Sequence, residues 1–268
     1  MKELARVLTI AGSDSGGGAG IQADLKTFQA FDVYGMSVIT CVTAQNTQGV
    51  RSVYDISPEV IADQLDMVVS DIGVDAVKIG MLSNADIIQV VAKKISEYQL
   101  KKVVLDPVMV AKSGHPLLRE GDREYLIREL LPLVDLVTPN IPEAEIMSNI
   151  KIEDLDSMKQ AAQQIKDLGA THVLIKGGHL KGAEIADLLL SNEKFFTYKT
   201  KRIETKNTHG TGCTLSSAIA ASLAQGNSLK EAVEIARDYV YKAIQNAPNN
   251  IGRGKGPLYH NVYYLLHK

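Results

Sequence analysis

Cysteine is scarce in this sequence, and neither sign of charge dominates it. Only Cys41 and Cys213 occur among the 268 residues, and their wide separation argues against a disulfide framework or a cysteine-based zinc site. Lys and Arg number 29 and Asp and Glu number 31, which gives a formal net charge of −2. This balance excludes a strongly basic nucleic-acid binder and a polybasic membrane anchor. We therefore expect no nucleic acid and no membrane among its partners, and free thiols suit a cytoplasmic protein.

Long hydrophobic runs and the common nucleotide motifs are also missing. No apolar stretch approaches the roughly 20 residues that cross a bilayer, and the mixed charges of residues 1–5 do not resemble a signal peptide. Neither the P-loop string nor the G-x-G-x-x-G dinucleotide fingerprint is present. Apolar residues make up 45% and charged residues 22% of the chain, as in ordinary globular proteins. There is no repeat and no convincing linker, and the length allows either two domains or one large α/β domain.

Short apolar runs alternate with amphipathic helical patterns along the chain. Strands are predicted at residues 6–11, 34–44, 74–82, 102–108, 135–138 and 173–176, with a hairpin of residues 186–190 and 194–200 around Ser191-Asn192. Helix starts are predicted at Ser57-Pro58, at Ser83, near Gly212 and at the capping box of Ser228 and Glu231.

This alternation predicts an α/β fold with a mainly parallel central sheet covered on both faces. In such sheets, ligands bind beyond the carboxyl ends of the strands. The polar residues and glycines that follow each predicted strand are therefore the candidate functional residues.

The first candidate is the glycine-rich loop that follows the first predicted strand. Residues 12–20 read GSDSGGGAG, and clustered glycine allows positive φ and close approach of the backbone to a ligand. We expect Asp24 in the first turn of the next helix, where a carboxylate also complements the helix dipole. A flexible connection with a helix-favouring Asp explains the same residues, so both interpretations stay open.

The second candidate is the loop KNTHGTGCT at residues 206–214, which precedes an Ala- and Ser-rich run. A buried helix start after Gly210, Thr211 and Gly212 offers free N–H groups and a positive dipole end, which together bind anions. Cys213 at this end is expected to be more acidic than a free thiol. The alternative is a small cysteine that packs as a hydrophobe.

Polar side chains follow three more predicted strands. Asp106 follows one strand, and Asn140 and Glu143 lie three residues apart after the next. Such oxygen ligands suit Mg²⁺, although a helix cap or a solvated helix start would also explain them. Lys176 ends a fourth strand, where a cation could meet an anion. Together these parts favour phosphoryl transfer to a small molecule over a generic binding domain.

The chain resembles a known family through seven segments that occur in one order. They are AGSDSGGGAGIQADLKTF, AQNTQGV, KIGML, VVLDPVM, TPNIPEAE, IKGGH and NTHGTGCTLS. These segments resemble the hydroxymethylpyrimidine/phosphomethylpyrimidine kinases, the thiamine-pathway members of the ribokinase superfamily. The resemblance implies one ribokinase-like kinase domain over residues 1–268, built as a three-layer αβα sandwich. Members of the family are commonly homodimers. It also implies transfer of the γ-phosphoryl of ATP, with Mg²⁺, to 4-amino-5-hydroxymethyl-2-methylpyrimidine and then to its monophosphate, which gives the pyrophosphate.

The resemblance also assigns roles to individual residues. It places five residues around the pyrimidine: Gly12, Asp24, Gln45, Met81 and Val108. It assigns ATP phosphates to Lys176 and to the 208–212 loop with Thr208 and Thr211, and magnesium with its waters to Asp106, Asn140 and Glu143. Cys213 would be the base, where most superfamily kinases have Asp, while the amides of Gly210 and Gly212 hold the transferring phosphoryl group. In a competing view the loop acts mainly by positioning, because the transition state is loose.

Two alternative functions remain beside this one. A pyridoxine/pyridoxal kinase of the same cysteine-containing type is the nearest, but those enzymes tend to have methionine where this chain has Gln45. A carboxamide both donates and accepts, which suits an aminopyrimidine edge and leaves pyridoxine as a side activity. The other alternative is a non-catalytic pyrimidine sensor, although every proposed catalytic position is present. Residues 112–115 resemble those of the pyrimidine enzymes and form a candidate flap.

Overall fold

The computed structural model describes residues 3–109, 118–179 and 182–262, so the candidate flap at 112–115 lies outside the described residues. The described strands are β1 (Arg6–Asp14), β2 (Tyr34–Asn46), β3 (Gly49–Asp55), β4 (Ala76–Ile79), β5 (Val103–Leu105), β6 (Leu136–Val137), β7 (His172–Ile175), β8 (Glu184–Ser191) and β9 (Lys194–Lys201). The α-helices are α1 (Gly20–Ala30), α2 (Pro58–Asp71), α3 (Ala85–Glu97), α4 (Arg123–Tyr125), α5 (Ile141–Ser148), α6 (Leu155–Asp167), α7 (Thr211–Ala224) and α8 (Leu229–Gln245). Shorter helical turns occupy Glu120–Asp122, Leu126–Leu130, Leu131–Leu133 and Gly177–His179.

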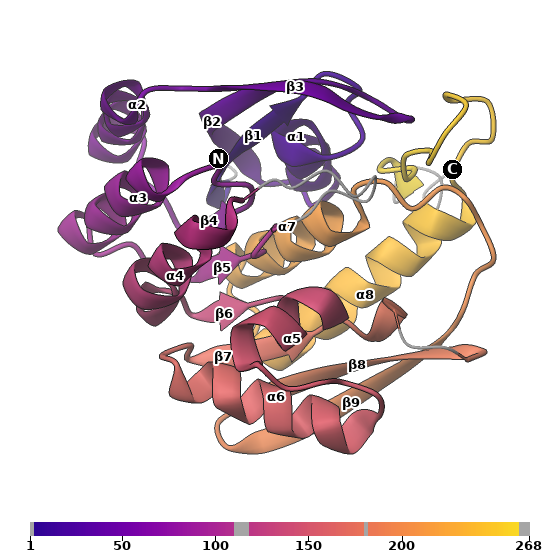
Figure 1. The fold of residues 1–268 in the computed structure, drawn as a ribbon. Helices are drawn as coiled ribbons and strands as arrows, with labels where there is room; N and C mark the ends of the chain where they lie inside the picture. Colours follow the sequence, from indigo (N-terminus) through magenta and orange to yellow (C-terminus); the bar gives the residue numbers. More distant parts are fainter. Residues whose placement is uncertain (1–2, 110–117, 180–181, 263–268) are drawn as a thin grey trace.

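All the described strands join one sheet in the order β3-β2-β1-β4-β5-β6-β7-β8-β9 (Figure 1). The six strands from β2 to β7 in this order are parallel, while β3, β8 and β9 pair antiparallel at the two edges. The predicted mainly parallel sheet is confirmed. Strand β3 was not predicted, because its side chains are half-buried or exposed and show no apolar alternation.

Helices cover both faces of the sheet and bury a separate apolar core on each (Figure 1). One core lies under α2, α3, α5 and α6, and the other lies under α1, α7 and α8. Neighbouring residues of β1 alternate between the two, since Leu8 packs in the first core and Val7 in the second. The three-layer αβα arrangement is therefore confirmed. In the described ranges, no helix is long and apolar enough to cross a membrane.

Local sequence signals explain most of the helix boundaries. Ser57 caps α2 ahead of Pro58, and Ser228 and Glu231 form the predicted capping box of α8. The predicted cap at Ser83 is wrong, because the Asn84 side chain accepts from the Ile87 amide at 3.0 Å and caps α3. The Ser83 hydroxyl instead donates to Asp55 at 2.6 Å.

The predicted hairpin forms, but its turn lies one residue later than expected. Ser191 pairs with Lys194, so Asn192 and Glu193 make the connection. Their φ angles are 48° and 59°, as a two-residue type I′ turn requires at both central positions. The side-chain amide of Asn tolerates this conformation better than most residues do.

Candidate active site

Asp106 and Lys176 form an ion pair at the carboxyl ends of β5 and β7. Lys176 Nζ lies 2.6 Å from Asp106 Oδ1, and both side chains are largely buried. Burial lowers the pKa of Lys176, but Asp106 and Glu143 outweigh this effect and leave the pKa above its ordinary value. The carboxylate and the cation, predicted from separate strand ends, are direct partners because parallel strands end at the same edge of the sheet.

The glycine loop before α7 lies directly on this ion pair. A Cβ atom placed on Gly212 would lie 3.0 Å from Asp106 Oδ2 and 3.3 Å from Lys176 Nζ. Gly210, with φ of 81°, is the N-cap of α7 and supplies no capping side chain. The Thr211 amide donates to the Thr208 carbonyl oxygen at 3.4 Å, so the helix start keeps the amides of Gly212 and Cys213 for another acceptor. Thr211 Oγ1 donates to the Thr208 carbonyl oxygen at 2.8 Å and closes the loop. This geometry suits an anion beside a buried cation.

Asn140 and Glu143 form a capping box at the start of α5. Asn140 Oδ1 accepts from the Glu143 amide at 3.0 Å, and Glu143 Oε2 accepts from the Asn140 amide at 2.8 Å. The solvated helix start considered for Glu143 is wrong, since the residue is buried. Burial raises the pKa of Glu143 to about 7, with Lys176 lowering it and Asp106 raising it.

The mutual influence of Asp106 and Glu143 bears on the predicted magnesium site. Asp106 disfavours the charge of Glu143 and raises its pKa, so a cation beside both carboxylates would be stabilised. Among the described residues, no group of three or more His, Cys, Asp and Glu side chains gathers as a metal cage. Mg²⁺ commonly takes only one or two carboxylates and completes its shell with water and phosphate. The donor set therefore fits a hydrated Mg²⁺ that arrives with a nucleotide.

Cys213 lies in the first turn of α7 and is half-buried. Burial raises its pKa to about 11; Lys78 lowers the pKa, while Asp24 and Asp106 raise it. The expected acidic thiol is therefore wrong for the protein without a ligand. Removal from water and two neighbouring carboxylates outweigh the helix start and the lysine, and the sequence does not show this balance.

Asp24 lies in the second turn of α1, not in the first turn as predicted, and its side chain has no exposed surface. Lys78 Nζ contacts Asp24 Oδ2 at 2.9 Å, the Thr9 hydroxyl donates to the same oxygen at 2.7 Å, and the Ser217 hydroxyl donates to Oδ1 at 2.7 Å. Both oxygens are thus occupied inside the protein, and Asp24 does not line an accessible pocket. Lys78 was missed, although a lysine within a buried strand signals a hidden partner.

The other predicted pyrimidine contacts lie near the ends of β1, β2, β4 and β5. A Cβ atom on Gly12 would lie 2.6 Å from Cys41 Sγ and 3.6 Å from Met81 Sδ, so these three residues pack together. Cys41 is buried and packs against Gly12 and Met81. Val108 follows Asp106 in a turn closed by an amide-to-carbonyl bond of 2.8 Å between them.

Gln45 lies near the end of β2 and borders a cavity of about 510 Å³ lined also by Ser15, Asn46 and Arg51. Its side chain contacts His209 of the loop at residues 206–214, which we call the anion loop. His209 in turn contacts Asp14 of the glycine-rich loop at residues 12–20. Sequence reasoning gave neither Asp14 nor His209 a role. The signal for Asp14 was the run of small residues after it, which lets an Asp side chain accept from the amides that follow.

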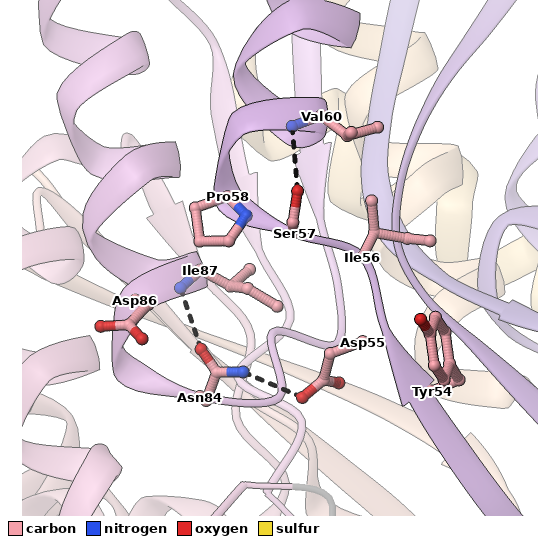
Figure 2. A pocket seen from close by; sticks show the side chains of 9 residues that line it. All are labelled: Tyr54, Asp55, Ile56, Ser57, Pro58, Val60, Asn84, Asp86 and Ile87. Atoms are coloured by element: carbon pink, nitrogen blue, oxygen red, sulfur yellow. Dashed lines mark hydrogen bonds between the residues drawn. The ribbon is translucent and has the colours of Figure 1, made fainter.

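A second cavity, of about 420 Å³, lies beside the starts of α2 and α3. Figure 2 shows Ser57 and Asn84 bonded to the helix starts, and Asn84 also bonded to Asp55. Tyr54 stands at one side of this cavity (Figure 2). No predicted site residue lines it, so the candidate active site is the edge where β1, β5, β6 and β7 end.

Comparison with known proteins agrees with this geometry. A family model described as phosphomethylpyrimidine kinase matches residues 14–259. This chain belongs to the phosphomethylpyrimidine kinase family. The resemblance stated from the sequence motifs is therefore confirmed, and so is the assignment of the chain as a kinase.

Two curated relatives and one solved structure illustrate membership of this family. The hydroxymethylpyrimidine/phosphomethylpyrimidine kinase of Bacillus subtilis is 50% identical over 259 residues, which cover 96% of this chain and 95% of that protein. The thiamine biosynthesis bifunctional protein ThiED of Geobacter sulfurreducens is 52% identical over 254 residues. The match covers 95% of this chain but only 52% of the ThiED protein. A pyridoxal kinase of Bacillus subtilis, solved with ADP, is 40% identical with a TM-score of 0.90, covering 98% of this chain and 100% of that one.

Proposed function

We propose that this phosphomethylpyrimidine kinase family member transfers the γ-phosphoryl of ATP to 4-amino-5-hydroxymethyl-2-methylpyrimidine and then to its monophosphate. The proposal rests on the site that lies within the matched residues 14–259. There the start of α7, which has no capping side chain, lies beside the buried ion pair of Asp106 and Lys176. We propose that residues 1–268 form one kinase domain. Its two substrates are the small pyrimidine and ATP.

The residues of the site divide the work of binding. Lys176 and the loop of Thr208 and Thr211 contact ATP phosphates, and the Gly210 and Gly212 amides hold the transferring phosphoryl group. Asp106 would hold hydrated Mg²⁺ together with Glu143, which Asn140 orients through the capping box. When bound, Mg²⁺ supplies charge neutralisation for the phosphates. The protein holds these groups in line with the hydroxymethyl oxygen, which lowers the entropic cost of transfer.

Cys213 is the proposed acceptor of the hydroxyl proton. The raised pKa means that the ligand-free protein holds the thiol form at neutral pH. The proposal therefore requires the thiolate to form in the substrate complex, where Lys78 and the start of α7 stabilise it. Catalysis mainly by positioning is the alternative, since a loose transition state needs little help from a base.

The residues of the substrate pocket determine whether the enzyme prefers the pyrimidine or pyridoxal. Gly12, Gln45, Met81 and Val108 line the pyrimidine site, with Asp24 placed behind it as a support for Lys78. The solved pyridoxal kinase is 40% identical and the pyrimidine kinase of Bacillus subtilis 50% identical, which favours the pyrimidine. The test compares kcat/KM for both substrates; a large preference for pyridoxal would overturn this choice.

ATP hydrolysis or transfer that depends on both the pyrimidine and Mg²⁺ separates an enzyme from a sensor. A protein that binds the pyrimidine but transfers nothing in the presence of Mg²⁺ would be a sensor. We also propose a cytoplasmic homodimer. The resemblance to a family whose members are commonly dimeric supports the homodimer. Light scattering of the purified protein measures the oligomeric state.

A further inference from the structure

Asp14 and His209 join the two glycine-rich loops of the site, although 195 residues separate them. His209 Nε2 lies 2.8 Å from Asp14 Oδ2, and the amides of Gly16 and Ala19 each donate to the same carboxylate at 2.8 Å. A Cβ atom on Gly18 would lie 2.5 Å from His209 Cδ2, so the imidazole packs against the first loop. The side chains of Asp14 and His209 are only 3% and 16% exposed. The contact therefore holds the ring in one orientation.

His209 reaches from this contact to Gln45. Its Nε2 lies 3.3 Å from Gln45 Nε2, and Gln45 Oε1 lies 3.1 Å from Thr43 Oγ1. The Gln45 backbone is held as well, because its amide donates to Ser15 Oγ at 2.9 Å and its carbonyl accepts from that hydroxyl at 2.8 Å. Gln45 is thus anchored at the backbone, and the two ends of its carboxamide face His209 and Thr43.

Whether His209 Nε2 carries a hydrogen determines which atom of the Gln45 carboxamide, oxygen or nitrogen, can lie beside it. Burial alone would raise the pKa of Asp14. The bond from His209 and the amides of Gly16 and Ala19 outweigh burial and leave the pKa below its ordinary value, so the group is a carboxylate. A carboxylate only accepts, so His209 Nε2 must carry a hydrogen and donate it. It cannot then accept from the amide nitrogen of Gln45. The single Nε2 hydrogen faces both Asp14 and Gln45, and only the carboxamide oxygen can share it, so the oxygen fits this position better than the amide nitrogen.

Thr43 imposes the same orientation from the other end. Its hydroxyl lies 2.9 Å from the Ser13 carbonyl oxygen, which can only accept. The one hydroxyl hydrogen of Thr43 is used there, so the end of Gln45 beside Thr43 must be the donor. The nitrogen and oxygen of a carboxamide have nearly the same shape, and a half-turn exchanges them without a steric cost. Thr43 therefore requires the Gln45 carboxamide to be turned by half a turn, and the shared hydrogen of His209 favours the same orientation.

We propose that Asp14, acting through His209, holds the Gln45 carboxamide with its oxygen toward His209 and its nitrogen toward Thr43. This fixes the donor and acceptor pattern that Gln45 offers to the substrate ring. The inference rests on the proposed function, in which Gln45 contacts the pyrimidine. Asp14 and His209 are then positioning residues for substrate selectivity, since an aminopyrimidine edge pairs an acceptor nitrogen with a donor amine and the pyridoxal ring has no exocyclic amine.

Steady-state kinetics of three variants test this role. His209→Phe keeps an aromatic ring but removes the donor, and we expect the KM for the pyrimidine to rise about tenfold, as for one lost hydrogen bond. The kcat and the KM for ATP should change little, and kcat/KM for pyridoxal much less than that for the pyrimidine. His209→Gln restores a donor and should recover most of the pyrimidine KM. In a protein that already carries Gln45→Ala, adding His209→Phe should not raise the KM for the pyrimidine any further.

A loss confined to kcat or to the KM for ATP would show that His209 only braces the anion loop, and would overturn the inference. Thermal unfolding of each variant verifies that the fold persists. If the wild-type protein does not phosphorylate the pyrimidine with ATP and Mg²⁺, the proposed function fails. If it does, and His209→Phe leaves the pyrimidine KM unchanged, only the present inference fails.

Nuclear magnetic resonance reads the orientation without any turnover. In protein labelled with ¹⁵N-histidine, the His209 signals are those lost in His209→Gln. We expect Nε2 to show the shift of a protonated nitrogen in the wild type. In Asp14→Asn the new amide can donate, and Nε2 should then move toward the shift of an unprotonated acceptor. An unprotonated Nε2 in the wild type would overturn the inference, whatever the kinetics show.

Discussion

Lys78 Nζ lies 2.9 Å from Asp24 Oδ2, and neither side chain has any exposed surface. The pair links β4 to α1, and Ser217 connects the same carboxylate to α7. Burial lowers the pKa of Lys78, but Asp24, Cys213 and Asp106 raise it above its ordinary value. The ion pair therefore lies beneath the catalytic helix start and keeps a permanent positive charge near Cys213.

Breaking this pair should cost far more stability than breaking an exposed one. In Asp24→Asn the Lys78 cation is left buried without a counter-charge, and we expect the free energy of unfolding to fall by about 3–5 kcal/mol. Urea unfolding followed by circular dichroism measures the change. Asp24→Asn combined with Lys78→Met removes both charges and should recover part of the loss.

The exposed pair of Lys159 and Asp156 on α6 is the matched control. Its side chains are 38% and 84% exposed, so Lys159→Met should change the free energy of unfolding by less than about 1 kcal/mol. Equal effects at the two sites would show that the buried pair does not have the structural role given to it here.

Replacing Cys213 tests the proposed base. General-base catalysis typically contributes about a hundredfold or more, so Cys213→Ala should lower kcat by that factor with the KM for ATP little changed. The raised pKa of about 11 adds a second expectation. The thiolate fraction grows with pH below that value, so kcat/KM of the wild type should rise above neutral pH while that of Cys213→Ala stays flat. Near-normal turnover in Cys213→Ala would refute the role and favour positioning alone.

Several parts of this site could be predicted from the sequence because they follow strand ends. Asp106, Asn140 and Lys176 each come directly after or soon after a buried strand, and parallel strands bring their carboxyl ends to one edge. The Gly210–Gly212 loop was predictable for a similar reason, since it precedes an apolar helix. Local order along the chain was sufficient for these residues.

The remaining features depend on contacts that no local pattern records. The Asp14–His209 pair joins loops 195 residues apart. A lysine within the buried strand β4 indicates a buried partner, but no local pattern shows that the partner is Asp24 of α1. The pKa of Cys213 depends on burial and on charges from three other elements, so a helix start alone predicted the wrong direction. Strand β3 was missed because an edge strand with exposed side chains lacks the alternation that marks half-buried strands.

Two glycines in the anion loop should respond differently to the same substitution. Gly210 has φ of 81°, and a Cβ there would collide with the Gly18 carbonyl oxygen, so Gly210→Ala should lower the free energy of unfolding by about 1–3 kcal/mol. The Gly212 Cβ would instead crowd Asp106 Oδ2 at 3.0 Å. Gly212→Ala should keep its thermal stability and lose kcat/KM for ATP by about tenfold or more. A Gly212→Ala protein with normal kinetics would contradict the placement of phosphates on this loop.

His260 should make the protein less stable in mild acid. Thr214 Oγ1 contacts its Nε2 at 3.1 Å, and burial, with help from Lys26, lowers the pKa of His260 from 6.5 to about 4. The unfolded chain binds the proton more tightly than the folded protein between these values, so the free energy of unfolding falls as pH drops through this window.

The size of that loss follows from the pKa difference. A shift from 6.5 to about 4 corresponds to a loss of about 3 kcal/mol that is complete below pH 4. His260→Gln removes the titration but keeps a polar group near Thr214. Relative to its own value at about pH 8, the variant should therefore lose less stability than the wild type does at about pH 4. Urea unfolding of both proteins across this range measures the difference, and parallel pH profiles would show that His260 is not the group that loses stability in acid.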